Sequence, residues 1–172
     1  MDANAADDDA SWPDTDPAAG SALPDGPPWR AAGGIPGPAR GKSLNPPNKR
    51  HFLAGVKRGR IREANSVVLR GYEEAVGDDV ALIAAGHARF NAWTHRYEIN
   101  GRSYGVEENG TVFPDAGVGI VNMNRNEYAA LAALARAGGA SDQVPEFTRD
   151  PRFRDNPQAI ATAQAVYDGT YK

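Results

Sequence analysis

The expected fold depends most on one stretch, Thr94-His-Arg-Tyr-Glu-Ile-Asn-Gly-Arg-Ser-Tyr-Gly-Val-Glu-Glu-Asn-Gly-Thr-Val-Phe113. Apolar and polar side chains alternate along it, with the period of two that is typical of β-strands. Asn100-Gly101 and Asn109-Gly110 interrupt this alternation, and Asn-Gly is the strongest short signal for a two-residue hairpin turn. The stretch therefore predicts a three-stranded antiparallel meander, to which residues 118–123 are a candidate fourth strand.

With two-residue turns, the register of both hairpins follows from the turn positions. The first turn pairs Ile99 with Arg102, Tyr97 with Tyr104 and His95 with Val106, and the second pairs Glu108 with Thr111 and Val106 with Phe113. Side chains alternate between the two faces of a sheet, so these paired residues share one face. That face is the more apolar of the two, and we expect it to be the core side.

Helical spacing of apolar residues predicts two helices before the meander and two after it. A glycine, Gly77, is the expected stop between the first two, and Asn124 or Asn126 the expected cap of the third. Pro157 suits the first turn of the last helix. The four helices are expected at about residues 63–76, 80–93, 127–137 and 158–167. The predicted class is α+β, with two N-terminal helices, a three- to four-stranded antiparallel meander and two C-terminal helices.

The formal net charge of −3 conceals three blocks of charge. Residues 1–29 hold seven acids and no base, and residues 30–62 hold nine bases and no acid. Nine of the 13 prolines precede residue 48, and such a stretch buries too little apolar surface to offset an ordering entropy of about 1–2 kcal/mol per residue. We therefore expect a disordered tail at 1–47, a basic arm at 48–62 and a single α+β domain at 63–172.

Several classes of protein are excluded by what the sequence lacks. The absence of cysteine excludes a disulfide scaffold, a thiolate zinc site and a cysteine nucleophile. Three histidines without carboxylates at a ligand spacing indicate no metal site, and we expect no cofactor. The acidic start has no apolar signal segment, and no run approaches the roughly 18 apolar residues of a membrane span. We expect a cytoplasmic protein that does not enter a membrane.

His95 is the leading candidate for catalysis, because the predicted register places it beside Tyr97, Arg102 and Tyr104. An imidazole in such a set can take the 2′-hydroxyl proton of RNA while an arginine stabilises phosphate charge, without a metal. The predicted architecture resembles that of small metal-independent ribonucleases that act as bacterial toxins, an analogy of fold only. The alternative is a histidine at the edge of the core that makes one structural hydrogen bond.

The basic residues point to a polyanion. Residues 40–62 hold eight Lys and Arg in 23 positions, a density that neutralises phosphates with little sequence reading. The expected ligand is nucleic acid, RNA rather than DNA, and the acidic segment 1–29 can compete for the same bases. The alternative function is a non-catalytic module that binds nucleic acid, an inhibitor or another partner protein. The candidate contacts are Lys49, Arg50, Lys57, Arg58, Arg60 and Arg62.

Overall fold

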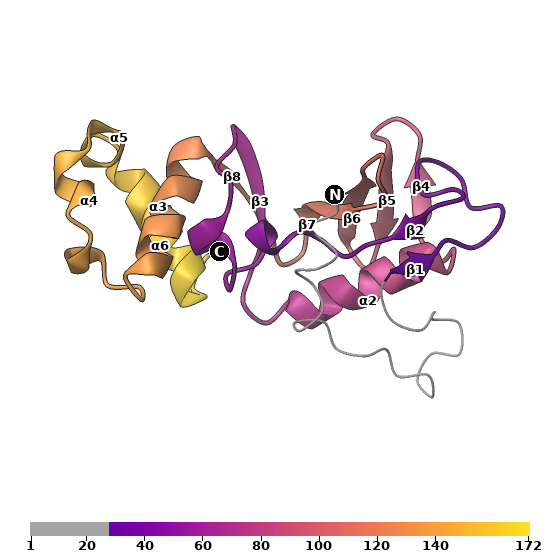
Figure 1. Cartoon of the computed structure of the whole chain (residues 1–172). Coiled ribbons are helices and arrows are strands. Elements are labelled where there is room, and N and C mark those ends of the chain that lie inside the picture. Colours follow the sequence, from indigo (N-terminus) through magenta and orange to yellow (C-terminus); the bar gives the residue numbers. More distant parts are fainter. Residues whose placement is uncertain (1–27) are drawn as a thin grey trace. The chain divides into compact units, whose positions relative to one another are not determined.

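The computed structural model describes residues 28–172, and the predictions made for residues 1–27 lie outside them. The chain forms two compact units (Figure 1). The described part of unit 1 is residues 28–48 and 71–120, and unit 2 is residues 49–70 and 121–172. The basic arm and the C-terminal helices, which are far apart in sequence, therefore belong to the same unit, and the boundaries expected at 47/48 and 62/63 do not separate the units.

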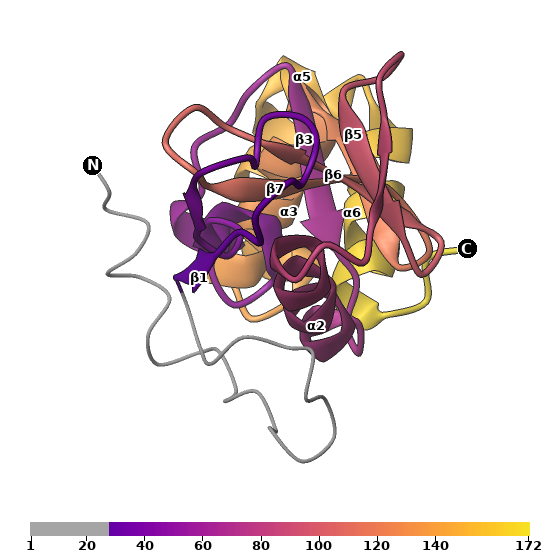
Figure 2. The same ribbon diagram turned by 90° about the vertical axis from the view of Figure 1, so that its right-hand side faces the viewer.

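Unit 1 contains the predicted meander as part of a four-stranded antiparallel sheet in the order β4-β5-β6-β7. These strands span Arg89–Asn91, Arg96–Ile99, Arg102–Val106 and Val112–Gly117. Figure 2 shows β5, β6 and β7 together with the helix α2, which spans Glu73–Ala84. The class is α+β as expected, but the fourth strand of the sheet is β4 and not residues 118–123.

The prediction of two N-terminal helices is wrong. The strand β3, Ala64–Val68, lies where the first half of the first helix was predicted, and α2 begins only at Glu73 and runs through the expected stop at Gly77. All of residues 65–68 are buried, and a short, fully buried segment with two valines favours a strand over a one-sided helix. Gly86, with a φ of 88°, ends the helix instead of Gly77, because the left-handed conformation there is open to glycine at little cost.

The first hairpin turn confirms the predicted register. Ile99 lies opposite Arg102 and Tyr97 opposite Tyr104. Asn100 and Gly101 have φ values of 54° and 78°, as a type I′ turn requires.

The second hairpin is shifted by one residue from the prediction, because its loop contains three residues, 108–110. Gly110 N–H donates to the carbonyl of Glu107 at 2.9 Å, and Gly110 alone in this loop has a positive φ, of 92°. This geometry is a type I turn followed by a left-handed glycine. Val106 therefore pairs with Val112, so that Val112 is buried and Phe113 lies half-buried on the opposite face.

Residues 28–47 differ from the predicted disordered tail, because they pack on unit 1. β1 (Trp29–Arg30) pairs with β2 (Ser43–Leu44), and Trp29 and Leu44 are buried. The hydroxyl of Tyr97 donates to the carbonyl of Pro36 at 2.6 Å and accepts from the N–H of Ala39 at 2.8 Å. A few buried apolar side chains and one tyrosine thus order a segment whose overall composition is typical of disorder.

Unit 2 pairs β3 with β8 (Ile120–Asn124) and packs the strands against helices. Of the two predicted caps, Asn124 and Asn126, it is Asn124 that caps α3, and Glu127 completes a capping box. Within unit 2, α3 and α6 lie side by side (Figure 1 and Figure 2). The helical segments of unit 2 are η2 (Lys49–His51), η3 (Val56–Arg58), α3 (Arg125–Arg136), η4 (Ser141–Gln143), α4 (Glu146–Arg149), α5 (Pro151–Arg154) and α6 (Pro157–Asp168). Among the helices of residues 28–172, none has the length and apolar character needed to span a membrane.

Candidate functional site

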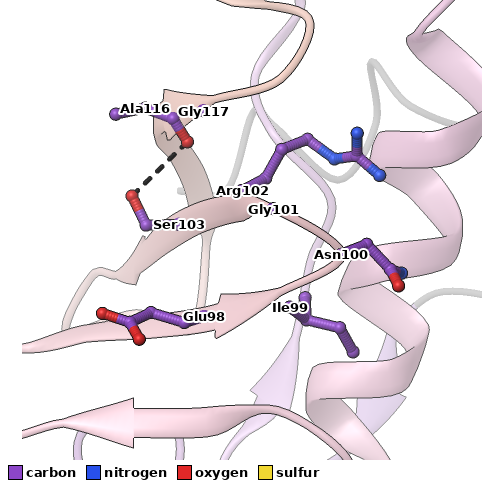
Figure 3. A pocket seen from close by; sticks show the side chains of 8 residues that line it. All are labelled: Glu98, Ile99, Asn100, Gly101, Arg102, Ser103, Ala116 and Gly117. Atoms are coloured by element: carbon purple, nitrogen blue, oxygen red, sulfur yellow. Dashed lines mark hydrogen bonds between the residues drawn. The ribbon is translucent and has the colours of Figure 1, made fainter.

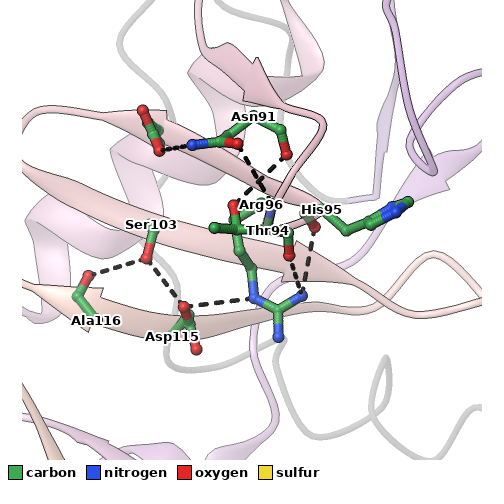
Figure 4. Close-up of polar contacts among 8 residues, drawn as sticks. Asn91, Thr94, His95, Arg96, Ser103, Asp115 and Ala116 are labelled. Atoms are coloured by element: carbon green, nitrogen blue, oxygen red, sulfur yellow. Dashed lines mark hydrogen bonds and ion pairs between the residues drawn. The ribbon is translucent and has the colours of Figure 1, made fainter.

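His95 lies in the turn before β5 and outside the strand. Its φ is 59°, and its N–H donates to the carbonyl of Asn91 at 2.8 Å. The side chain is exposed, and the centroids of its ring and the Phe90 ring are 6.1 Å apart in an edge-on contact. Figure 4 shows the imidazole directed away from Arg96 and Asp115. The predicted pairing with Val106, which would have brought His95 onto the buried face, does not form.

Two of the other predicted catalytic residues surround a buried aspartate. Asp79, on α2, is fully buried, and its Oδ2 is 2.6 Å from Nε of Arg102. The hydroxyl of Tyr104 also donates to Oδ2, while Asn100 Nδ2 donates to Oδ1 at 2.8 Å. The hydrogen bond to Asp79 raises the pKa of Arg102 above its ordinary value. Burial raises the pKa of Tyr104 well above its ordinary value, and the hydrogen bond to Asp79 is the second cause. Sequence reasoning missed Asp79, which carries no motif.

The four residues predicted as catalytic are therefore not brought together. Tyr97 fastens residues 36–39 to the sheet, and Tyr104 and Arg102 hold Asp79. A buried ion pair whose hydrogen bonds are satisfied is costly to break, at about 3–5 kcal/mol when one partner is removed. The structure gives these three side chains positions that stabilise unit 1, while His95 lies apart from them in its exposed turn.

An open pocket of about 480 Å³ lies at the turn between β5 and β6 (Figure 3). Its Ser103 hydroxyl donates to Asp115 Oδ2 at 3.2 Å, and no imidazole lies among the lining residues that could activate the hydroxyl. Figure 3 shows the side chains of Asn100 and Arg102 directed toward α2, where both contact Asp79. The positive charge of Arg102 is therefore directed away from the pocket. The lining residues are Glu98, Ile99, Asn100, Gly101, Arg102, Ser103, Ala116 and Gly117.

Unit 2 has a buried polar cluster of its own. Arg50, predicted as a surface contact for nucleic acid, is only 9% exposed, and its guanidinium lies 5.1 Å from the centroid of the Tyr128 ring. Arg50 Nη2 donates to Oδ1 of Asn65, and Nε donates to the carbonyl of Arg60 at 3.0 Å. Burial lowers the pKa of Arg50, and Arg62 contributes in the same direction. Arg50 is therefore a structural residue, which its position in a basic run did not indicate.

His51 is a second buried residue that the sequence placed in the basic arm. Its Nδ1 lies 2.7 Å from the carbonyl of Ser66 and 3.1 Å from the Ser66 hydroxyl. Burial lowers the pKa of His51 to about 4. The hydrogen bond to Ser66 acts in the opposite direction, but its effect on the pKa is smaller than that of burial. The imidazole is neutral at pH 7 and adds no charge to the surface.

Residues 57–62, which we call the basic loop, have several backbone N–H and carbonyl groups hydrogen-bonded to side chains of unit 2. Asn65 Oδ1 accepts from the N–H of Arg62 at 3.0 Å, and its Nδ2 donates to the Arg62 carbonyl at 2.7 Å. Arg136 Nη1 donates to the carbonyl of Lys57 at 3.1 Å. Together with the bond from Arg50 to Arg60, these contacts engage the carbonyl oxygens of Lys57, Arg60 and Arg62 within unit 2 and hold the path of the loop.

Gly59 allows the basic loop to approach α3 closely. A Cβ atom at this position would lie 2.0 Å from the hydroxyl oxygen of Tyr128 and 3.1 Å from the carbonyl oxygen of Val56. The same hydroxyl donates to the carbonyl of Arg50 at 2.6 Å. Only a residue without a side chain fits here, so the sequence Lys-Arg-Gly-Arg is a requirement of packing as well as a run of charge.

The basic side chains of the loop are exposed, and they have no ionic partner among the residues that the structure describes. Lys57, Arg58, Arg60 and Arg62 are all exposed, and no ion pair within residues 28–172 includes any of them. Lys49, at the start of unit 2, is exposed as well. The loop therefore presents uncompensated positive charge to solvent.

Charge is distributed unequally between the units. Unit 2 holds thirteen Lys and Arg against seven Asp and Glu, a net charge of +6, whereas the described part of unit 1 holds six against eight. Three acids of unit 2 already pair with arginines outside the basic loop: Glu63 with Arg125, Asp150 with Arg152 and Asp155 with Arg154. No group of three His, Asp or Glu that could hold a metal occurs in the part of the chain that the structure describes.

Comparisons with protein-family models, with curated proteins and with solved structures found no match. What the molecule does is therefore inferred from the charge and geometry of the residues described above.

Proposed function

We propose that this protein binds nucleic acid through phosphate contacts made by the basic loop of unit 2. One observation supports the proposal: four exposed cations have no ion pair among residues 28–172, and the backbone of their loop is hydrogen-bonded by side chains of unit 2. These cations are Lys57, Arg58, Arg60 and Arg62. Basic side chains of this kind neutralise phosphates and release condensed counterions, which is the main source of affinity for nucleic acid.

The fixed backbone strengthens this proposal. A loop that is already ordered loses less conformational entropy on binding than a flexible arm does. The carbonyl oxygens of Lys57, Arg60 and Arg62, which would repel a phosphate, already accept hydrogen bonds within unit 2. The four basic side chains of the loop are exposed, and Lys49 is a fifth predicted contact that is exposed in the same unit.

The geometry favours a binding module over a ribonuclease. A ribonuclease of the predicted type needs an acid/base group and a phosphate-stabilising cation around one scissile bond. The guanidinium of Arg102 is engaged by Asp79, and that of Arg96 pairs with Asp115 at 3.4 Å. His95 alone of the proposed set is exposed.

Fluorescence anisotropy with labelled 20-nucleotide RNA and DNA, single- and double-stranded, tests the proposal. The variant Lys57→Gln/Arg58→Gln/Arg60→Gln/Arg62→Gln removes the four cations of the basic loop. The control, Arg125→Gln/Arg149→Gln/Arg152→Gln/Arg154→Gln, removes the same charge elsewhere in unit 2. Because each lost phosphate contact reduces the salt slope by about 0.7 to 0.9, we expect the first variant to lower the slope of log K against log salt by about 3, and the control by less than 1.

Three results would overturn this proposal. They are failure of the wild-type protein to bind any of the four ligands, equal losses in the two variants, and no loss in the first variant. A parallel incubation with RNA in EDTA addresses the enzyme alternative. We expect the RNA to remain intact; cleavage by the wild type that His95→Ala abolishes would show a metal-independent ribonuclease instead.

A further inference from the structure

Trp93 is the most exposed large apolar residue in the described part of the chain. It is 96% exposed, and the next are Val118 at 53% and Tyr171 at 38%. Trp29, by contrast, is buried at 3%. Full exposure of an indole to water is unfavourable, so a tryptophan held in this position is a candidate for recognition of a ligand.

The turn that carries Trp93 is fixed by hydrogen bonds to Asn91. Asn91 Oδ1 accepts from the N–H groups of Trp93 at 3.0 Å and of Thr94 at 3.3 Å, while its carbonyl accepts from His95 N–H at 2.8 Å. Asn91 is itself fixed, because its Nδ2 donates to Glu98 Oε2 at 2.9 Å (Figure 4). The indole is thus presented to solvent from an ordered turn.

The surroundings of Trp93 are polar and poor in apolar surface. Thr94 and His95 are exposed beside it, and Arg89, on β4, has a side chain that is 74% exposed and pairs with Glu98. Val118 lies near Gly101, at the opposite end of β5 from Trp93. A protein-binding hot spot is normally ringed by further contacts over roughly 800 Å² per partner, whereas base stacking needs one aromatic plane with cations nearby.

We infer that Trp93 is a stacking platform for a nucleobase, so that the ligand is single-stranded nucleic acid. This inference rests on the proposed function and deepens it. Every base has a flat π-face, so stacking tolerates any sequence, but the base must be free of a partner strand to reach an exposed indole. His95, exposed in the same turn, offers a hydrogen-bond donor to the nucleotide held there.

Variants at Trp93 test the inference, with binding followed by anisotropy on the full chain with a single-stranded 20-nucleotide RNA and on the matching duplex. Trp93→Ala should weaken single-strand binding by roughly 5- to 150-fold, the range for loss of one stacked base. It should leave duplex affinity and the salt slope unchanged. Trp93→Phe should retain part of the affinity, and Tyr171→Ala, which removes an exposed aromatic ring elsewhere, should bind as the wild type does.

Unchanged single-strand affinity of Trp93→Ala, while the basic-loop variant loses binding, would overturn the stacking role alone. Binding of the indole in a pocket of a partner protein would then be the remaining explanation for its exposure. Equal weakening of single strand and duplex would also overturn stacking. If the basic-loop variant loses no affinity, the proposed function fails as well, so the two failures are distinct. Equal thermal unfolding temperatures of the wild type and Trp93→Ala verify that the exposed substitution leaves the fold intact.

Discussion

Each of the two units contains a buried polar cluster with an arginine, and the arginine has a charged partner in one unit and a neutral partner in the other. In unit 1, the buried carboxylate of Asp79 forms an ion pair with Arg102 and neutralises its charge. In unit 2, the buried Arg50 has a neutral partner in Asn65 and supports a loop of further cations. The comparison teaches that a charged residue near the core can either cancel charge inside the protein or help to present it outside.

The largest expected effect is the loss of the acid in unit 1. Asp79→Asn leaves Arg102 buried without a counter-charge, and we expect a loss of about 3–5 kcal/mol in the free energy of unfolding. Urea denaturation, followed by circular dichroism, measures it. Asp78→Asn is the matched control, because Asp78 is the adjacent acid and is exposed. An equal effect of the two substitutions would contradict the structural importance of the Asp79 cluster.

A pH effect of intermediate size is expected from unit 2. The folded-state pKa of His51 is about 4, against 6.5 in the unfolded chain. The unfolded chain therefore binds the proton first as the pH falls, and stability is lost between about pH 6.5 and pH 4, by about 2 kcal/mol at pH 5. His51→Gln, which keeps a donor for the Ser66 carbonyl, should lack this dependence. Denaturation at pH 7.5 and pH 5 compares the two proteins, and parallel pH profiles would show that another group is responsible.

The effect that links stability to binding is expected at Asn65. Asn65→Ala removes the acceptor of Arg50 Nη2 and the side chain that bonds both backbone groups of Arg62, at a cost of about 1–3 kcal/mol. We expect weaker binding of RNA as well, because the basic loop loses its fixed path although all its cations remain. Asn122→Ala is the exposed control on β8. Unchanged RNA affinity in a destabilised Asn65→Ala protein would mean that the loop binds without being held in place.

Some elements were predictable because their signals are local. The Asn100-Gly101 turn needs positive φ at both positions, and Asn124 with Glu127 satisfies the free N–H groups of α3. The prediction of a two-residue turn at Asn109-Gly110 was wrong because the same dipeptide also fits a three-residue loop, in which only the glycine is left-handed. The helix predicted at 63–76 was wrong because the four buried residues of β3 satisfy a helical pattern as well as a strand pattern.

The candidate site was predictable only as a run of charge. Its density of Lys and Arg indicated a polyanion ligand, but the run does not separate the exposed Arg60 and Arg62 from the buried Arg50. That distinction depends on Asn65 and Tyr128, which come from other parts of the chain. The exposure of Trp93 was likewise hidden, because the predicted helix at 80–93 ended on it.

The sequence by itself determined the α+β class, one hairpin turn, the cap of α3, the last helix and the segregation of acids from bases, since each depends on neighbouring residues or on composition. Only the tertiary structure decided that the chain forms two units and that residues 28–47 are packed. It also decided that Asp79 and Arg50 are buried while the basic loop and Trp93 face solvent. The physical reason is that burial is set by contacts between residues distant in the chain, and local spacing carries no record of them.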